Sequence, residues 1–210
     1  MLIVCGRFTL ITDLSVIKES FHIQEVALEY RPGNNISPGQ QIPAIIHDNK
    51  TRLISFRWGL IPAWAKDPSI GNKMFNARAE TVAVKPSFRY AFKKHRCLII
   101  ADGFYEWQKL DKKKVPFHFS LKSGSPFGFA GLYETWISPE NKAVNTCTII
   151  TTDANDLLKP IHDRMPVIVP KDKEGIWINA SVKDQKELLS ILVPYPSDEM
   201  KMSEGFIPMS

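Results

Sequence analysis

The run Cys97-Leu98-Ile99-Ile100-Ala101, followed closely by Gly103-Phe104-Tyr105-Glu106-Trp107-Gln108, decides the fold of this chain. Both segments are short and rich in β-branched or aromatic residues, which is typical of strands. Further strand candidates lie at 115–121, 127–132 and 146–152, and turns rich in glycine, lysine or asparagine separate them. Short strands that do not alternate regularly with helices argue for an α+β fold and against a doubly wound sheet.

The remaining elements are expected to be short, because fifteen prolines are spread through the chain. Residues 41–47 and 52–58 flank Asp48-Asn49-Lys50 and predict a hairpin. Residues 14–21, with Thr12 or Asp13 as cap, predict a helix, as do 87–94 and 184–192, and 166–169 predict another strand. The expected architecture is a mainly antiparallel or mixed, barrel-like β-sheet with a few short peripheral helices.

Composition indicates one folded unit. The 210 residues contain no repeat and no long linker, so we expect a single domain over 1–210, and 44% hydrophobic residues suffice for a sizeable core.

The net charge of +5 favours a polyanionic partner. Cys5, Cys97 and Cys147 form no disulfide framework, which predicts a reducing cytoplasm. We expect neither a secretory leader nor a membrane span, because the opening residues and all apolar runs are too short.

Cys5 carries the most informative chemistry. If the residues before it are removed, it presents a free amine and a thiol on neighbouring carbons. Such a 1,2-aminothiol condenses with an aldehyde, first to a Schiff base and then to a five-membered thiazolidine. An α-amine with a pKa near roughly 8 and a thiol near roughly 8.5 are both partly nucleophilic at neutral pH.

Three polar stretches are candidates for a site around that cysteine. Asn76, Arg78 and Glu80 would share one face of an extended segment, although a solvated strand face has the same pattern. Glu106 stands among aromatic residues, where it is either exposed or a desolvated proton carrier.

In the third stretch, His162 could shuttle protons and Arg164 could hold a phosphate, although an isolated loop histidine is more often a plain polar residue. Trp64 follows a proline in a loop-like stretch. It either stacks on a nucleic-acid base or folds back on the core. The chain has no CxxC, HExxH, GxSxG or glycine-rich phosphate loop, so we expect no metal and no cofactor.

Taken together, these stretches resemble the SOS response-associated peptidase family, also described as abasic-site processing proteins. The resemblance covers nearly the whole chain, and its marks occur in the family's order. They are Cys5-Gly6-Arg7-Phe8, Asn35-Ile36-Ser37-Pro38, Arg57-Trp58-Gly59-Leu60-Ile61-Pro62, Asn76-Ala77-Arg78-Ala79-Glu80-Thr81, Gly103-Phe104-Tyr105-Glu106-Trp107, Ala130-Gly131-Leu132-Tyr133 and Ile161-His162-Asp163-Arg164-Met165-Pro166.

The resemblance implies a DNA-modifying activity in the SOS response. The family's N-terminal cysteine condenses with the aldehyde of an abasic site in single-stranded DNA and forms a covalent cross-link that shields the lesion. Carried over, Cys5 is the nucleophile, Asn76 positions the amine and sugar, Glu106 carries a proton, and His162 assists at the sugar hydroxyl. The DNA-binding positions are Arg7, Asn35, Pro38, Trp64, Arg78 and Arg164. We expect a monomer that works in the cytoplasm and is associated with the nucleoid when it is bound to DNA.

This sequence departs from the family at its start, where Leu2-Ile3-Val4 stand between Met1 and Cys5. The leading hypothesis is a start at Val4, read from a GUG codon as methionine; self-cleavage before Cys5, or no thiazolidine chemistry at all, are the alternatives. At the other end, many relatives continue beyond Ser210 with a further asparagine-containing tail. Two rival functions stay open: a cysteine peptidase with His162 as base, and a non-catalytic module that binds single strands.

Overall fold

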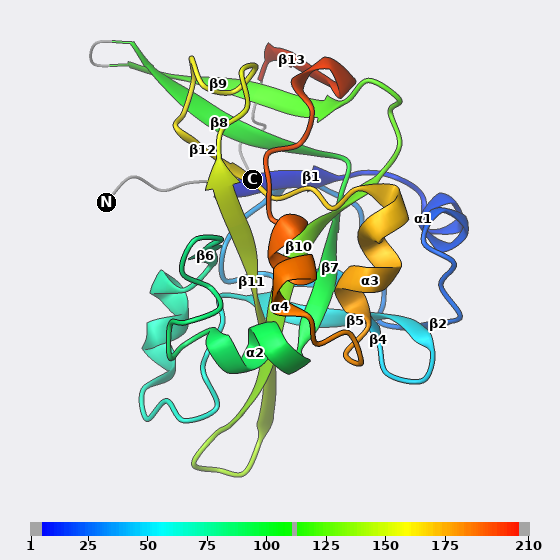
Figure 1. Cartoon of the computed structure of the whole chain (residues 1–210), viewed down its shortest axis with the longest axis vertical. Helices are drawn as coiled ribbons and strands as arrows, with labels where there is room; N and C mark the ends of the chain where they lie inside the picture. The colour runs from blue at the N-terminus through cyan, green and yellow to red at the C-terminus, as the bar shows by residue number, and fades with distance from the viewer. Residues whose placement is uncertain (1–5, 111–112, 206–210) are drawn as a thin grey trace.

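A five-stranded barrel forms the centre of the protein, whose computed structural model describes residues 6–110 and 113–205. Five strands follow one another around it by hydrogen bonding: β11 (Ala143–Asp153), β10 (Phe127–Ile137), β7 (Arg96–Ala101), β4 (Gln41–His47) and β5 (Thr51–Trp58). Successive neighbours are antiparallel, and β11 closes the ring by pairing parallel to β5. The predicted α+β fold with a mixed, barrel-like sheet is therefore confirmed (Figure 1).

Three short strands extend this barrel. β6 (Asn76–Arg78) pairs parallel with β11, and β12 (Arg164–Pro166) pairs antiparallel with β11. β2 (Glu25–Ala27) pairs parallel with β5. Because β11 carries both β6 and β12, the polar stretches around Asn76 and His162 are brought to the same region of the barrel.

A second, antiparallel sheet packs against the barrel and forms the upper part of the molecule in Figure 1. Its strand order is β13 (Met200–Glu204), β9 (Lys113–Leu121), β8 (Gly103–Leu110), β1 (Arg7–Leu10) and β3 (Gly33–Ile36). The ring of Phe8 on β1 lies 5.2 Å from Trp58 and 6.0 Å from Phe129 of the barrel. The two sheets therefore share one hydrophobic core and form a single domain.

Helices are short and lie outside the barrel (Figure 1). The α-helices are α1 (Leu14–Ser20), α2 (Arg89–Lys94), α3 (Glu174–Ile178) and α4 (Gln185–Ser190), and the 3-10 helices are η1 (Pro68–Lys73), η2 (Lys171–Lys173) and η3 (Ser197–Glu199). Among the described residues, no helix is long and apolar enough to cross a membrane.

Local details correct some expectations. Asp13 occupies the N-cap position of α1 but makes no side-chain cap bond, and Thr12 instead donates its hydroxyl to Asp102 at 2.9 Å. The helix expected from 87 begins at Arg89. The strand expected at 166–169 was placed wrongly in the sequence. β12 ends at Pro166, and Ile168 makes only an isolated bridge to Phe129.

Candidate functional site

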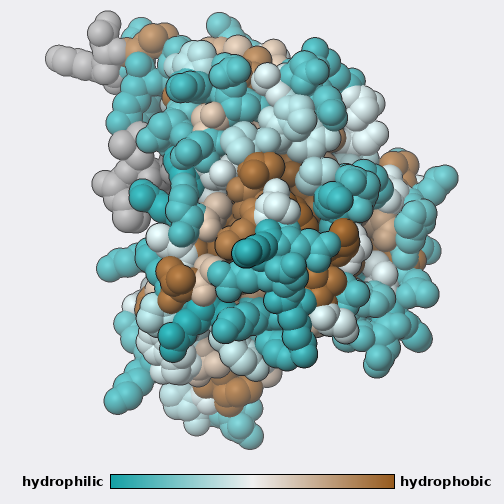
Figure 2. Space-filling model, in the orientation of Figure 1, coloured by the Kyte–Doolittle hydropathy of each residue, from teal (hydrophilic) through white to brown (hydrophobic). Residues whose placement is uncertain are grey.

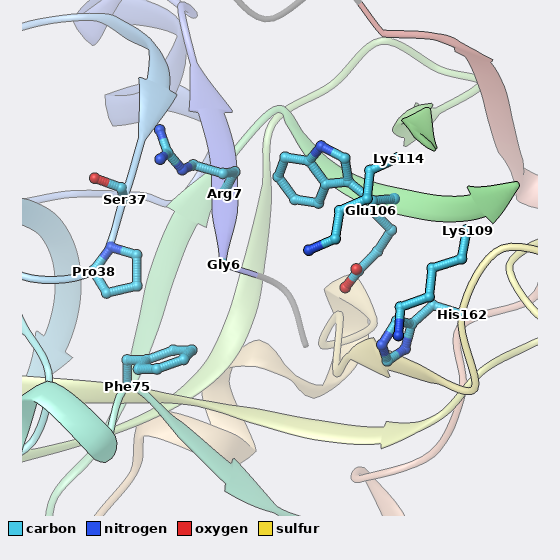
Figure 3. A pocket seen from close by; sticks show the side chains of 10 residues that line it. Gly6, Arg7, Ser37, Pro38, Phe75, Glu106, Lys109, Lys114 and His162 are labelled. Carbon is cyan, nitrogen blue, oxygen red and sulfur yellow. The ribbon is translucent and has the colours of Figure 1, made fainter. Parts of the chain in front are cut away.

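A cavity of about 660 Å³ opens where five separate segments of the chain meet. They are the start of β1, the turn after β3, the residue before β6, the β8–β9 hairpin and the loop between β11 and β12. Its lining residues are Gly6, Arg7, Ser37, Pro38, Phe75, Glu106, Trp107, Lys109, Lys114 and His162 (Figure 3). A concave site that combines a carboxylate, an imidazole and several cations is a default candidate for binding and chemistry.

Glu106 is the buried acid of this cavity. It lies on β8 opposite Phe117 of β9, and only 1% of its surface is exposed. Strand alternation places it on the same face as the core residue Phe104, and Figure 3 shows its carboxylate turned into the cavity. The structure therefore confirms that Glu106 is buried rather than exposed, and its role as a proton carrier stays a prediction.

His162 lines the cavity, and its Nδ1 atom fixes the orientation of the ring. The backbone N–H of Arg164 donates to Nδ1 at 3.0 Å, so Nδ1 is an acceptor and the proton of the neutral ring resides on Nε2. Asp163 Oδ1 also lies 3.0 Å from Nδ1. Nδ1 cannot both accept a hydrogen bond from the Arg164 amide and donate one to Asp163. We assign the bond to the amide, because the Asp163 carboxylate is exposed to solvent. Nε2 is buried and has no hydrogen-bond partner among the described residues.

The loop that carries His162 is held at both ends. Gln108 on β8 donates its side-chain amide to Pro160 O at 3.2 Å. Asn155 donates to Tyr195 O at 2.7 Å and accepts from Leu158 N at 3.0 Å. These bonds fix the imidazole relative to the strand that carries Glu106.

Arg164 clamps this loop to neighbouring strands. Its guanidinium forms a bidentate pair with Glu80, and it also donates to Asp153 Oδ1 and Thr151 O, each at 2.7 Å. The hydrogen bonds from Arg164 lower the pKa of Glu80. Both terminal nitrogens of Arg164 are therefore engaged inside the protein, and phosphate binding by this residue stays a prediction.

Asn76 and Arg78 lie on β6, beside the cavity. Ala77 and Ala79 are buried whereas Arg78 and Glu80 are exposed, so the alternation predicted for this stretch is confirmed. Phe75 lines the cavity, but Asn76, which follows it, is not part of the lining. The positioning role assigned to Asn76 remains a prediction.

The DNA-binding candidates fall into two groups. Arg7 donates to Asn35 Oδ1 at 2.6 Å across the β1–β3 pair, and Arg7 lines the cavity together with Pro38. Trp64 stands apart from the lining, in a turn, with 62% of its surface exposed. The tryptophan is thus available to stack on a base, which is the exposed alternative considered from the sequence.

Lys109 and Lys114 were missed by the sequence reasoning. They lie directly opposite one another on β8 and β9, and both line the cavity. Like charges in that arrangement repel, and no carboxylate among the described residues forms an ion pair with either of them. The lysine-rich turn is the available signal in the sequence, but a turn of this composition predicts only a boundary between strands.

Cys5 lies outside the described residues, and its peptide neighbour Gly6 is buried in the cavity lining. The other two thiols, Cys97 and Cys147, are fully buried, and burial raises the pKa of both. Within residues 6–110 and 113–205, no cluster of His, Cys, Asp and Glu has the size to hold a metal ion.

Comparison with known proteins assigns the family. A family model described as SOS response associated peptidase (SRAP) matches residues 4–204. The chain belongs to this family.

Relatives of this SRAP chain share most of its length. Abasic site processing protein YoqW of Bacillus subtilis is 51% identical over 201 residues, which covers 94% of this chain and 90% of the relative. Abasic site processing protein HMCES of Gallus gallus is 32% identical, over 79% of this chain and 59% of its own length. A crystal structure of a Bacteroides thetaiotaomicron protein superposes with a TM-score of 0.87 at 28% identity, covering 95% and 91% of the two chains.

Proposed function

We propose that this protein processes abasic sites by forming a covalent cross-link between Cys5 and the aldehyde of the lesion in single-stranded DNA. The observation that carries the proposal is the cavity beside Gly6, in which a buried carboxylate, a buried imidazole and a pair of lysines converge. The names of the relatives, about half identical over nearly the full chain, support the abasic site as substrate.

The reaction has two steps. The free α-amine of Cys5 attacks the aldehyde carbon, and loss of one water gives a Schiff base. The thiol then adds to the same carbon, the new C–S bond closes a thiazolidine, and the thiol proton passes to the nitrogen. The chemistry requires that the active chain begin at Cys5. It is a lyase-like modification of DNA and uses no cofactor.

Glu106 and His162 divide the proton transfers. Water leaves the carbinolamine only if its hydroxyl is protonated, and the buried carboxyl of Glu106 is the group we assign to that transfer. His162, whose Nδ1 is occupied as an acceptor, is assigned a hydrogen bond from its neutral ring to the sugar oxygen that is released on ring opening. The neighbouring phosphates are assigned to Arg7, Lys109 and Lys114, with Arg78 and Trp64 further along the strand.

The tautomer of His162 disfavours the rival function of a cysteine peptidase. A histidine that activates a thiol must accept a proton on the nitrogen facing the thiol. Here Nδ1 accepts from the Arg164 amide, so the neutral ring carries its proton on Nε2 and has no free acceptor nitrogen. The arrangement therefore supports donation better than general-base catalysis.

A denaturing gel with an abasic single-stranded oligonucleotide tests the proposal. Protein purified from its native host should give a shifted band that survives denaturation, and Cys5→Ala should abolish it. A matched sample with an acetylated α-amine and an intact thiol should also give no band. A cross-link that persists after acetylation would exclude the thiazolidine, and binding to intact strands without any cross-link would leave only a non-catalytic module.

A further inference from the structure

A second cavity, of about 310 Å³, lies between α2 and α4 and shares no residue with the candidate site. It is lined by Phe92, Lys93, Lys94, Lys183, Gln185 and Leu188. In Figure 2, hydrophobic surface is visible among hydrophilic side chains in the region where α4 lies. Nothing in the proposed cross-linking chemistry uses this groove.

The groove combines an apolar floor with a cationic rim. Phe92 and Leu188 belong to the core, with exposed fractions of 1% and 2%. Lys93, Lys94 and Lys183 are exposed. None of the three lysines pairs with a carboxylate in the described part of the chain.

A fourth cation lies beneath the rim. The guanidinium of Arg96 is buried, and within the described part of the chain its hydrogen bonds go only to backbone carbonyls, those of Trp177, Phe92, Lys93, Asn179 and Val182. No carboxylate of the described residues forms an ion pair with it. Carbonyl dipoles hold this guanidinium but do not cancel its charge, so it adds to the positive potential of the three lysines.

Two simpler explanations of the lysines are weak. Cations at a helix C-terminus interact with its free carbonyls, but the last-turn carbonyls of Phe92 and Lys93 are already bonded to Arg96. Asp184 is an acidic neighbour of Lys183, but its carboxylate caps α4 by accepting from Lys186 N at 2.9 Å. The positive charges of the three lysines are therefore available to an external partner.

We propose that this groove binds an acidic peptide segment of a partner protein, with carboxylates on the three lysines and an apolar side chain against the methylene stems of those lysines, above Phe92 and Leu188. A peptide fits better than a nucleic acid. Among the described lining residues no aromatic ring is exposed for a base to stack on, because Phe92 is 1% exposed, whereas carboxylates need only the three exposed lysines.

Fluorescence anisotropy of the full chain tests this proposal. The probe is a fluorescein-labelled peptide of alternating Asp and Glu that ends in Phe-Leu. The wild-type chain should bind it, and Lys93→Glu/Lys183→Glu should bind it at least about tenfold more weakly. Lys50→Glu/Lys142→Glu, two exposed lysines in other turns, makes the same change in net charge and should bind normally.

Two further measurements separate the contribution of the apolar residues from that of charge alone. A peptide ending in Ala-Ala should bind more weakly than the Phe-Leu peptide, and oligothymidylate should not displace the probe. Absence of wild-type binding, equal loss in both double variants, or displacement by oligothymidylate would overturn the proposal. Cross-linking of abasic DNA should be unchanged in Lys93→Glu/Lys183→Glu, so the two proposals fail separately.

Discussion

At the scale of single residues, Glu106 is the side chain whose burial most affects the chemistry. This carboxyl group is 1% exposed and lines the cavity, so it is shielded from bulk water and lies within reach of a bound ligand. We expect Glu106→Gln, which keeps the shape and removes the acid, to slow cross-linking by about 10²- to 10⁴-fold. Affinity for abasic single-stranded DNA should change little.

Single-turnover cross-linking and equilibrium binding measure these two quantities. Equal losses in both would assign Glu106 to binding rather than to proton transfer. Cross-linking at the wild-type rate would remove it from the mechanism altogether.

The sequence predicted the identity of the candidate residues better than their surroundings. It singled out Glu106 and His162 because their local context is unusual, and the structure places both in one cavity. It did not predict the internal clamp on Arg164, because Glu80 and Asp153 approach it only through strand pairing. Nor did it predict the tautomer of His162, which depends on a single backbone hydrogen bond.

Among the elements, the β8–β9 hairpin carries the lysine pair at the cavity. If Lys109 and Lys114 each contact one phosphate, Lys109→Ala/Lys114→Ala should bind single-stranded DNA more weakly. It should also reduce the slope of log affinity against log salt by about 1.4. The control Lys50→Ala/Lys142→Ala changes the net charge equally at distant turns. An unchanged slope in the hairpin variant, or an equal reduction in the control, would refute this role.

The Glu80–Arg164 clamp joins β12 to the segment after β6 and predicts a pH-dependent stability. The lowered pKa of Glu80 means that the folded state favours the carboxylate. Its stabilisation is therefore complete above the unfolded carboxyl pKa of about 4.3 and is lost as pH falls through the lower, folded value.

Because half of the Glu80 side chain is exposed, the effect is modest. Glu80→Gln should lower Tm by about 1–3 °C at pH 7. Thermal unfolding of both proteins across pH 7 to 3 checks this, and the difference should shrink at the acid end. A constant difference at all pH values would show that the charge of Glu80 does not contribute.

Local elements were predicted well and long-range ones were not. The hairpin at 41–58 was correct because a turn joins adjacent strands, and its signal lies in one stretch of sequence. β1, β3 and β13 were missed because they are short and their partners, apart from the β1–β3 pair, lie far away in the sequence. The pairing of β5 with β11 closes the barrel across about ninety residues, and no local pattern encodes it.

For the whole molecule, a shared core couples the two sheets. Phe129 of the barrel is fully buried and contacts Phe8 and Phe104 of the second sheet, at ring distances of 6.0 and 5.9 Å. We expect Phe129→Ala to reduce the free energy of unfolding by about 3–5 kcal/mol. Urea unfolding followed by tryptophan fluorescence and by far-UV circular dichroism should give coincident transitions in both proteins. Separate transitions would show that the sheets unfold independently.

The cavity itself is a property of the whole molecule. Its lining comes from segments spread between Gly6 and His162, and only the complete topology brings them together. The sequence therefore predicted several residues of the site. It predicted neither the cavity that they line nor the groove between α2 and α4.

The proposed function requires that the amine and thiol of Cys5 capture an abasic aldehyde together. The most direct test is the intact mass of the cross-linked product, followed by mapping of the modified peptide. We expect a mass equal to chain plus oligonucleotide minus one water, unaffected by borohydride, with the modification on a peptide that begins at Cys5. A modification mapped to a lysine of the β8–β9 hairpin, or no adduct from protein whose first residue is Cys5, would contradict it.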